Sequence, residues 1–246
     1  MIRKGAPPAG GGADGGDAMR RLPLLLGLAI LLVSTLPAAA ARVTLGPGED
    51  AYTLDLIAAT PERSVVELQL NHFDLEALTI GGAPYTQVTL GKRPLHLERG
   101  LPALPTLRES LAIPDAGVMA LRVLAVEYQE FAGIDVAPSK GNLLRTVDPA
   151  LVEYSFSDFY ASDGWCPAEA AKLETPYILR DTRGLVLELN PFQYSPATRT
   201  LRVATRLTVE VALAGGGGEN LLDRRPAARV RDFEDLYARH YLNYTA

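Results

Sequence analysis

The sequence predicts an all-β protein, an antiparallel β-sandwich of jelly-roll-like type. Apolar and polar residues alternate without a break from Leu201 to Leu213, a period of two that is typical of a half-buried strand. Shorter alternating runs recur roughly every ten residues and are separated by Gly/Pro turns. Helical spacing is convincing only near the C-terminus, from Asp232 to Tyr241.

The N-terminus has the pattern of an export signal. Residues 1–18 are rich in Gly, Ala and Pro, and Met19-Arg20-Arg21 then precedes an apolar run, Leu22 to Leu36, and a row of alanines. A basic start, a short apolar stretch and small residues are typical of a secretory signal peptide. We therefore expect residues 1–41 to be a signal peptide with Met19 as the true start. The mature chain is then periplasmic or extracellular, without a stable membrane span.

Eight extended segments are expected before the irregular middle of the chain. Val66, Leu68 and Leu70, for example, alternate with polar residues as in a half-buried strand. The segments are residues 43–45, 52–57, 66–70, 73–80, 85–90, 107–113, 118–131 and 134–138, the last as a short edge strand. The stretch 91–105 between two of them contains several prolines, which keep it out of a central ladder.

The second half of the chain is expected to contain a long hairpin. Residues 139–176 are irregular, with a turn or two of helix expected at residues 168–173. Strands at 185–189 and 201–213 are then expected to pair, joined by residues 191–198. At roughly 3.3 Å per residue the second strand would span about 40 Å, which favours a central or bent strand.

The pattern also suggests where the domain ends. We expect the sandwich to cover residues 42–214. Gly215 to Gly218 is expected to be a flexible linker. The remainder of residues 215–246 would hold the C-terminal helix.

Residue chemistry gives no sign of an enzyme. The formal net charge is −5 and no basic patch with interleaved aromatics occurs, so nucleic acid is not an expected partner. The three histidines, His72, His96 and His240, are too scattered for a metal site, and no motif for a cofactor is present. Cys166 is the sole cysteine and is followed by Pro167, which removes a backbone N–H that would stabilise a thiolate. We expect no catalytic residue, metal or cofactor.

Several stretches together resemble a known family. Gly100 to Pro105 reads Gly-Leu-Pro-Ala-Leu-Pro, Arg183-Gly184 follows later, and Asn190 to Leu201 reads Asn-Pro-Phe-Gln-Tyr-Ser-Pro-Ala-Thr-Arg-Thr-Leu. This pattern resembles the N-terminal propeptide of the gingipain-type cysteine peptidases, over most of residues 65–245. Residues 233–243 are similar to the segment that joins such propeptides to the catalytic domain, so the resemblance implies that residues 215–246 lead to a catalytic domain that this sequence does not contain.

The resemblance implies a β-sandwich propeptide that helps a following cysteine peptidase domain to fold and keeps it latent, in cis or in trans. A loop would lie across the active-site cleft, with a basic side chain imitating the residue before the scissile bond. Lys140 and Arg145 are the candidates for that side chain. Candidates for maturation cleavage are Arg224, Arg225, Arg229 and Arg231.

Alternatives remain open at this level. The candidate basic residues are also explained as solvated surface charges. The whole chain is also compatible with a stand-alone secreted or cell-envelope β-sandwich that serves structure or adhesion. A carbohydrate-binding module fits less well, because there is one tryptophan and the aromatic residues do not share one strand face.

Overall fold

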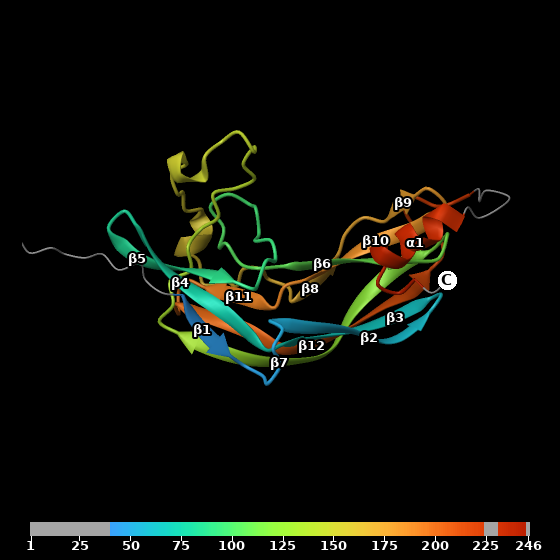
Figure 1. The fold of residues 1–246 in the computed structure, drawn as a ribbon, viewed down its shortest axis with the longest axis horizontal. Coiled ribbons are helices and arrows are strands. Elements are labelled where there is room, and N and C mark those ends of the chain that lie inside the picture. Colours follow the sequence, from blue (N-terminus) through green and yellow to red (C-terminus); the bar gives the residue numbers. More distant parts are fainter. Residues whose placement is uncertain (1–39, 224–230, 245–246) are drawn as a thin grey trace, which may run out of the picture. The chain divides into compact units, whose positions relative to one another are not determined.

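Antiparallel strands are the main regular structure in this computed structural model, which describes residues 40–223 and 231–244 (Figure 1). The strands are β1 (Ala41–Thr44), β2 (Tyr52–Thr60), β3 (Arg63–Leu70), β4 (His72–Ile80), β5 (Ala83–Thr89), β6 (Leu107–Ala112), β7 (Val118–Ala132), β8 (Ala171–Leu173), β9 (Tyr177–Leu179), β10 (Thr182–Leu189), β11 (Phe192–Ser195) and β12 (Thr200–Gly215). Two 3₁₀ turns, η1 (Pro149–Leu151) and η2 (Asp158–Ala161), and helix α1 (Arg231–His240) complete the described elements. The predicted all-β fold with a short C-terminal helix is confirmed.

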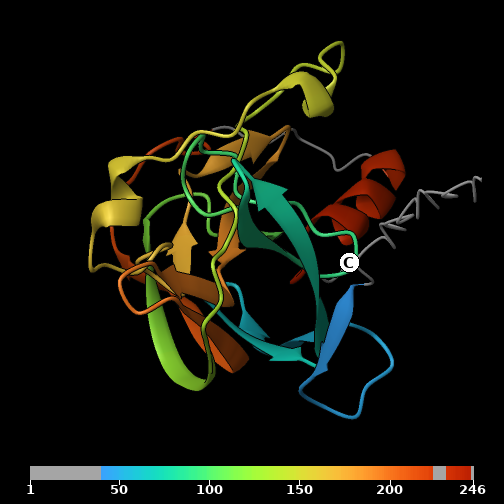
Figure 2. The ribbon, with the colours of Figure 1, turned by 90° about the vertical axis from the view of Figure 1, so that its left-hand side faces the viewer.

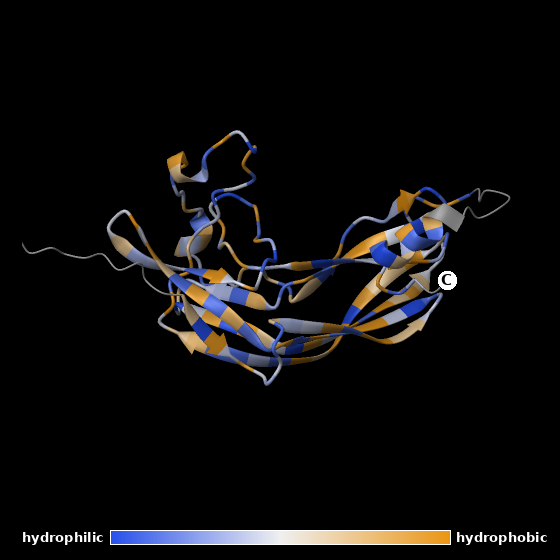
Figure 3. Ribbon diagram, viewed as in Figure 1, coloured by the Kyte–Doolittle hydropathy of each residue, from blue (hydrophilic) through white to orange (hydrophobic). Residues whose placement is uncertain are grey.

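The strands form three sheets around a shared core. One sheet has the order β1-β4-β5, the second β6-β10-β8 with β9 also on β10, and the third β11-β12-β3-β2 with β7 on β12. The second sheet faces the third as the two layers of a sandwich (Figure 1). Figure 3 shows the alternation of apolar and polar residues along these strands. Side chains from both layers, such as Leu111 and Leu187 on one and Leu68 and Val209 on the other, belong to one buried cluster.

Strand β12 is the centre of the third sheet. It pairs with β7 along one edge, and with β11 and then β3 along the other. Leu201, Val203, Leu207 and Val209 are fully buried on its inner face. Three register shifts against β7 bend the strand, the first at Thr205. The predicted long strand is therefore both central and bent.

The predicted pairing of residues 185–189 with 201–213 is wrong. Strand β10 lies in the other layer and pairs with β6, whereas the hairpin partner of β12 is the short strand β11. The chain changes layer at Asn190-Pro191, where the proline has no N–H to continue a ladder. The Asn190 side chain holds this crossing, since it donates to the carbonyl of Glu169 at 3.2 Å and accepts from the Thr106 hydroxyl at 3.1 Å.

Two shorter predictions also differ from the structure. Residues 168–173 do not form a helix, because Ala171–Leu173 is strand β8 on β10. There Lys172 lies opposite Glu188 and its Nζ is 3.2 Å from a carboxylate oxygen, so the cross-strand contact favours the extended form. Residues 134–138 make isolated bridges, to Thr86 and to Pro102, and not an edge strand. Pro138 has no backbone N–H to contribute to a ladder.

Arg183 on β10 is, together with Glu188, the most deeply buried charged residue among those described, with 1% of its surface exposed. Its guanidinium donates to four backbone carbonyls at 2.7–3.0 Å, those of Pro114, Gly117, Glu219 and Asn220. Burial lowers the pKa of this guanidinium. The contacts fasten the turn after β6 and the segment after β12 to the same strand, so the glycine-rich stretch that begins at Gly215 continues against the sandwich.

Replacing this guanidinium by an apolar chain is expected to destabilise the fold. In Arg183→Met the four carbonyls lose their donor, and the free energy of unfolding should fall by roughly 3 kcal/mol because one buried and three partly buried hydrogen bonds are lost. Urea unfolding followed by circular dichroism measures this loss. Arg206→Met, at an exposed position on β12, is the matched control and should change stability little. Equal stability of the two variants would contradict the assigned role.

A second charged group joins three strands of the third sheet. Glu210 on β12 accepts from Arg63 on β3 and from Arg122 on β7, the latter at 2.5 Å. Hydrogen bonds from Arg63 and then Arg122 hold the pKa of Glu210 below its usual range.

The lowered pKa of Glu210 predicts a pH-dependent contribution to stability. Because the folded-state pKa is below the unfolded one, the contribution is complete above the unfolded-state value of about 4.3. It is lost as the pH falls through the lower folded-state value. Urea unfolding from pH 3 to pH 7 should therefore show a stability gap between wild type and Glu210→Gln that closes in acid. A gap that stays constant with pH would rule out this coupling.

Candidate functional site

The longest irregular segment connects β7 to β8 and extends away from the sheets. We call residues 139–157 the arch. Figure 2 shows it in yellow, with η1 near its far end. The arch contains both candidate basic residues, Lys140 and Arg145.

Both feet of the arch are held by one short segment of the loop that precedes β6. The N–H of Gly100 donates to the carbonyl of Ser139 at 2.9 Å, and the carbonyl of Gly100 accepts from the N–H of Ser157 at 3.0 Å. The N–H of Ser139 donates to Leu101, and Arg99 Nε donates to the hydroxyl of Ser155 at 3.1 Å. A closed loop with fixed ends results.

Gly100 is required at this junction for two reasons. Its φ is +85°, in the region that L side chains rarely adopt. A Cβ at this position would also lie 3.0 Å from the backbone nitrogen of Ser157. The glycine therefore permits the close approach of the second foot.

Contacts inside the arch occupy Lys140. Its Nζ donates to the carbonyl of Pro149 at 2.7 Å and lies 4.2 Å from the ring centre of Tyr154. Asp148 caps η1, since its carboxylate accepts from the N–H of Ala150 at 2.9 Å. Lys140 thus braces the two sides of the arch against each other.

Arg145 is placed differently, at the exposed end of the arch. A hydrogen bond of 2.9 Å from the N–H of Val147 to the carbonyl of Leu144 closes a turn around it. Two leucines of the arch are unusually exposed, Leu144 next to Arg145 at 74% and Leu151 at 82%. Within the described residues no hydrogen bond or ion pair engages the Arg145 side chain. The arch therefore presents one free cation between two exposed leucines.

Aromatic residues support the second foot. Phe156 lies 5.3 Å from Tyr85 and 4.9 Å from Tyr160, measured between ring centres, and Tyr160 continues to Tyr194 on β11. The hydroxyl of Tyr160 donates to the carbonyl of Val136 at 2.9 Å. Burial raises the pKa of Tyr160, and raises that of Tyr194 to about 12. Both phenols are neutral at physiological pH and serve packing and hydrogen bonding.

The other titratable residues singled out in the sequence do not form a catalytic group. Cys166 is half-buried, and burial and then the charge of Glu98 raise the pKa of its thiol to about 11. A thiol that is protonated at neutral pH is a poor nucleophile. His96 contacts Asn190 at 3.1 Å and His240 contacts the Tyr177 hydroxyl at 2.7 Å, at separate places in the fold. In residues 40–223 and 231–244 no group of three His, Cys, Asp or Glu residues is arranged to hold a metal.

Three of the four candidates for maturation cleavage cannot be placed. Arg224, Arg225 and Arg229 lie outside the described residues, and Arg231 is the first residue of α1.

The part of the chain that the structure describes contains no helix long and apolar enough to cross a membrane.

Sequence reasoning identified the basic residues of the arch but missed what supports them. The role of Gly100 depends on Ser139 and Ser157, which are distant in sequence, and no local pattern reveals that contact. The three aromatic residues at Phe156, Phe159 and Tyr160 were a usable signal, because such a cluster in an irregular segment indicates anchoring to a core.

Comparison with known proteins shows the family to which the chain belongs. The family model Propeptide_C25 matches residues 64–241. Gingipain R1 of Porphyromonas gingivalis is 39% identical over 147 residues, which cover 60% of this chain and 15% of that protein. Lys-gingipain of the same organism is 25% identical over 206 residues, 80% of this chain and 12% of the relative. This chain thus spans no more than a fifth of the length of these curated relatives.

Solved structures show the same fold. One, described as a complex of the Porphyromonas gingivalis RgpB pro- and mature domains, has a TM-score of 0.72 at 30% identity over 78% of this chain and 98% of the matched one. A second, from work on the zymogenic latency of gingipain K of that organism, shares the fold with a TM-score of 0.61 at 21% identity, over 72% of this chain and 100% of the matched one. The resemblance seen in the sequence is confirmed. The chain belongs to the Propeptide_C25 family and is a gingipain-type propeptide.

Proposed function

We propose that this propeptide keeps a gingipain-type cysteine peptidase domain latent by laying the arch across its active-site cleft, and that it assists the folding of that domain. The observation that carries the proposal is the arch itself, with both feet fixed on the segment around Gly100 and Arg145 free at its end. The similarity to the pro-domain of a solved complex of pro- and mature domains supports it.

The physical argument is one of preorganisation. A peptide that enters a substrate cleft loses conformational entropy, whereas a loop that is already held at both ends loses less. Hydrogen bonds at the feet and the Lys140 contact inside the arch fix the loop before any partner arrives. The exposed leucines of the arch offer apolar surface to the partner.

Arg145 is our candidate for the side chain that imitates the residue before the scissile bond. A guanidinium presents several donors in a plane and pairs well with a carboxylate in a specificity pocket. Lys140 is the weaker candidate, because its ammonium is already engaged by Pro149 and Tyr154.

The precursor organisation completes the proposal. Residues 1–41 act as a signal peptide, so the protein is exported to the periplasm or the cell exterior. Residues 42–214 form the inhibitory sandwich, and residues 215–246 lead toward a catalytic domain. Arg224, Arg225, Arg229 and Arg231 are proposed as sites of maturation cleavage. Family membership favours this arrangement over a stand-alone adhesion module.

Inhibition in trans tests the proposed function directly. The purified propeptide should inhibit the mature domain of a gingipain-type peptidase, and Arg145→Ala should weaken inhibition about thirtyfold or more, as for a central interface residue. Lys92→Ala, an exposed cation away from the arch, should leave the inhibition constant unchanged. Well-folded propeptide that does not inhibit at micromolar concentration would refute the proposal.

The rigidity of the arch gives a separate expectation. In Gly100→Ala the new Cβ pushes against Ser157 and the φ of +85° is strained, so the second foot should loosen. We expect weaker inhibition and faster proteolysis within residues 140–156, measured by mass spectrometry of the fragments. Gly133→Ala is the matched control, because it has a positive φ but open space around the added Cβ. Equal proteolysis in the two variants would exclude a rigid arch.

A further inference from the structure

Helix α1 is held on the sandwich by aromatic residues. Tyr237 on α1 and Tyr241, which directly follows the helix, are each 2% exposed. The Tyr237 hydroxyl donates to the carboxylate of Asp181, and the ring of Tyr241 stacks on that of Tyr177 at 6.4 Å between centres. A helix this short is marginal in water by itself, so contacts with the sandwich are what stabilise it.

A glycine on the sandwich makes room for these rings. A Cβ at Gly184 would lie 2.5 Å from a ring carbon of Tyr241 and 2.9 Å from one of Tyr177. At the other end of the helix, the guanidinium of Arg180 lies 3.9 Å from the ring centre of Phe233. The helix thus fits a surface that is shaped for it along its length.

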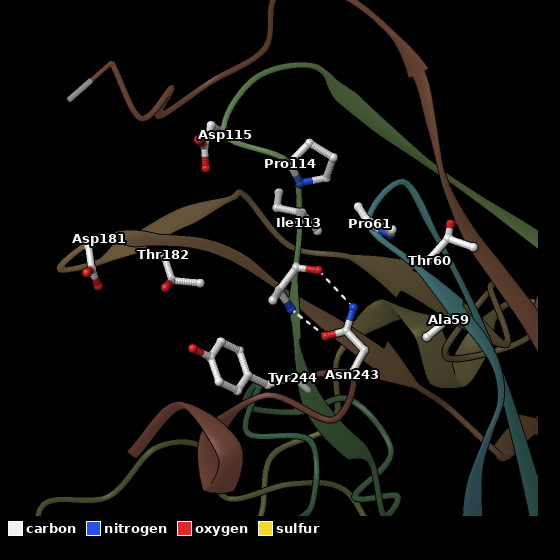
Figure 4. Close-up of a pocket in the computed structure, with 11 residues that line it drawn as sticks. Ala59, Thr60, Pro61, Ile113, Pro114, Asp115, Asp181, Thr182, Asn243 and Tyr244 are labelled. Carbon is white, nitrogen blue, oxygen red and sulfur yellow. Dashed lines mark hydrogen bonds between the residues drawn. The ribbon is translucent and has the colours of Figure 1, made fainter. Parts of the chain in front are cut away.

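The residues after α1 pair with the end of β6. The N–H of Leu242 donates to the carbonyl of Ser110 at 2.8 Å. The side-chain amide of Asn243 then acts like a strand residue, accepting from the N–H of Ala112 at 2.7 Å and donating to its carbonyl at 2.9 Å (Figure 4). The same amide donates to the hydroxyl of Ser64 at 3.0 Å. Three polar partners on two strands are satisfied by one side chain.

The chain is equally well held on the other side of residues 224–230. Arg183 binds the carbonyls of Glu219 and Asn220, and the N–H of Leu222 donates to the carbonyl of Asp115 at 2.9 Å. The N–H of Gly117 donates to the carbonyl of Gly217 at 2.7 Å. Independent anchors therefore lie immediately before and after this stretch.

We infer that the sandwich binds residues 231–244 through an interface that does not depend on chain continuity, so that a cut within residues 224–230 releases neither new end. The partner for this surface is the protein's own C-terminal segment, recognised by a tyrosine pair over Gly184 and by the Asn243 amide on Ala112.

The inference has a consequence that rests on the proposed function. A peptidase domain that follows residue 246 would stay attached to its inhibitor after a cut at Arg224, Arg225 or Arg229. Such a cut then leaves the peptidase domain inhibited. Activation of that domain requires a cut in the arch, a cut beyond Tyr244, or unfolding of the sandwich.

The experiment cuts the full chain at one place. Residues 224–230 are replaced by the recognition sequence of a site-specific protease, and cutting is brought to completion, as judged on a denaturing gel. Size-exclusion chromatography and native mass spectrometry at micromolar concentration should then find both fragments together, at the mass of the uncut chain plus the water added by hydrolysis. Separate elution of the C-terminal fragment from folded sandwich would overturn the inference.

Variants connect retention to the named contacts. Gly184→Ala and Asn243→Ala should each weaken retention of the cut fragment about tenfold or more, because a ring is displaced or buried polar groups lose their partner. Asn142→Ala, an exposed asparagine of the arch, should retain it as the wild type does. Circular dichroism of the uncut variants is the control for folding. In the uncut chain residues 231–244 stay covalently attached to the sandwich, so we expect these variants to be folded. Retention unchanged in both test variants would refute the assigned interface.

Inhibition of the peptidase by the cut protein is measured separately, so that the proposed inhibitory function and the proposed interface for residues 231–244 can be distinguished. Cut protein that retains its fragment but does not inhibit contradicts the proposed function and leaves this interface standing. Cut protein that inhibits but loses its fragment contradicts the interface alone.

Discussion

Pairing of β12 along both of its edges is the constraint on which the rest of the structure depends. A strand of this length in a core leaves a long row of backbone N–H and C=O groups that must be satisfied. Strand β7 satisfies one edge, and β3 and β11 divide the other between them. Because β7 ends beside Thr200, the chain leaves the sheet at that point. The arch is the connection that follows, and so its position is a result of how β12 is paired.

Much of the fold could be predicted because alternation reports which face of a strand is buried. The strand at residues 201–213 was visible for that reason, and the C-terminal helix was visible from its helical spacing of apolar residues. Alternation does not report which strand pairs with which, and it disappears where both faces are buried, as in all four residues of β11. The hairpin was therefore assigned to the wrong partner. The short strand at Ala171 was missed because its extended form depends on a contact with β10 that is distant in sequence.

The candidate site, like the fold, could be predicted from the sequence only in part. Sequence and resemblance together named Lys140 and Arg145 as equivalent cations in one irregular segment. Their difference is one of environment: a carbonyl and an aromatic ring occupy Lys140, whereas Arg145 lies at an exposed turn. Buried Arg183 illustrates the converse case. A strand pattern containing an arginine suggests an outward-facing charge, and only the four converging carbonyls explain why it faces inward.

The way both feet of the arch meet at Gly100 bears on how such a protein can diverge. Since the two ends are fixed against one residue of the scaffold, residues 140–154 can change in length and composition without altering the contacts at the feet, and closing a longer loop costs little additional entropy. The arch can therefore vary while the sandwich that carries it stays the same. Selection for binding to a cognate peptidase can act on the arch alone, whereas the sequence of the sandwich is constrained separately by the need to fold.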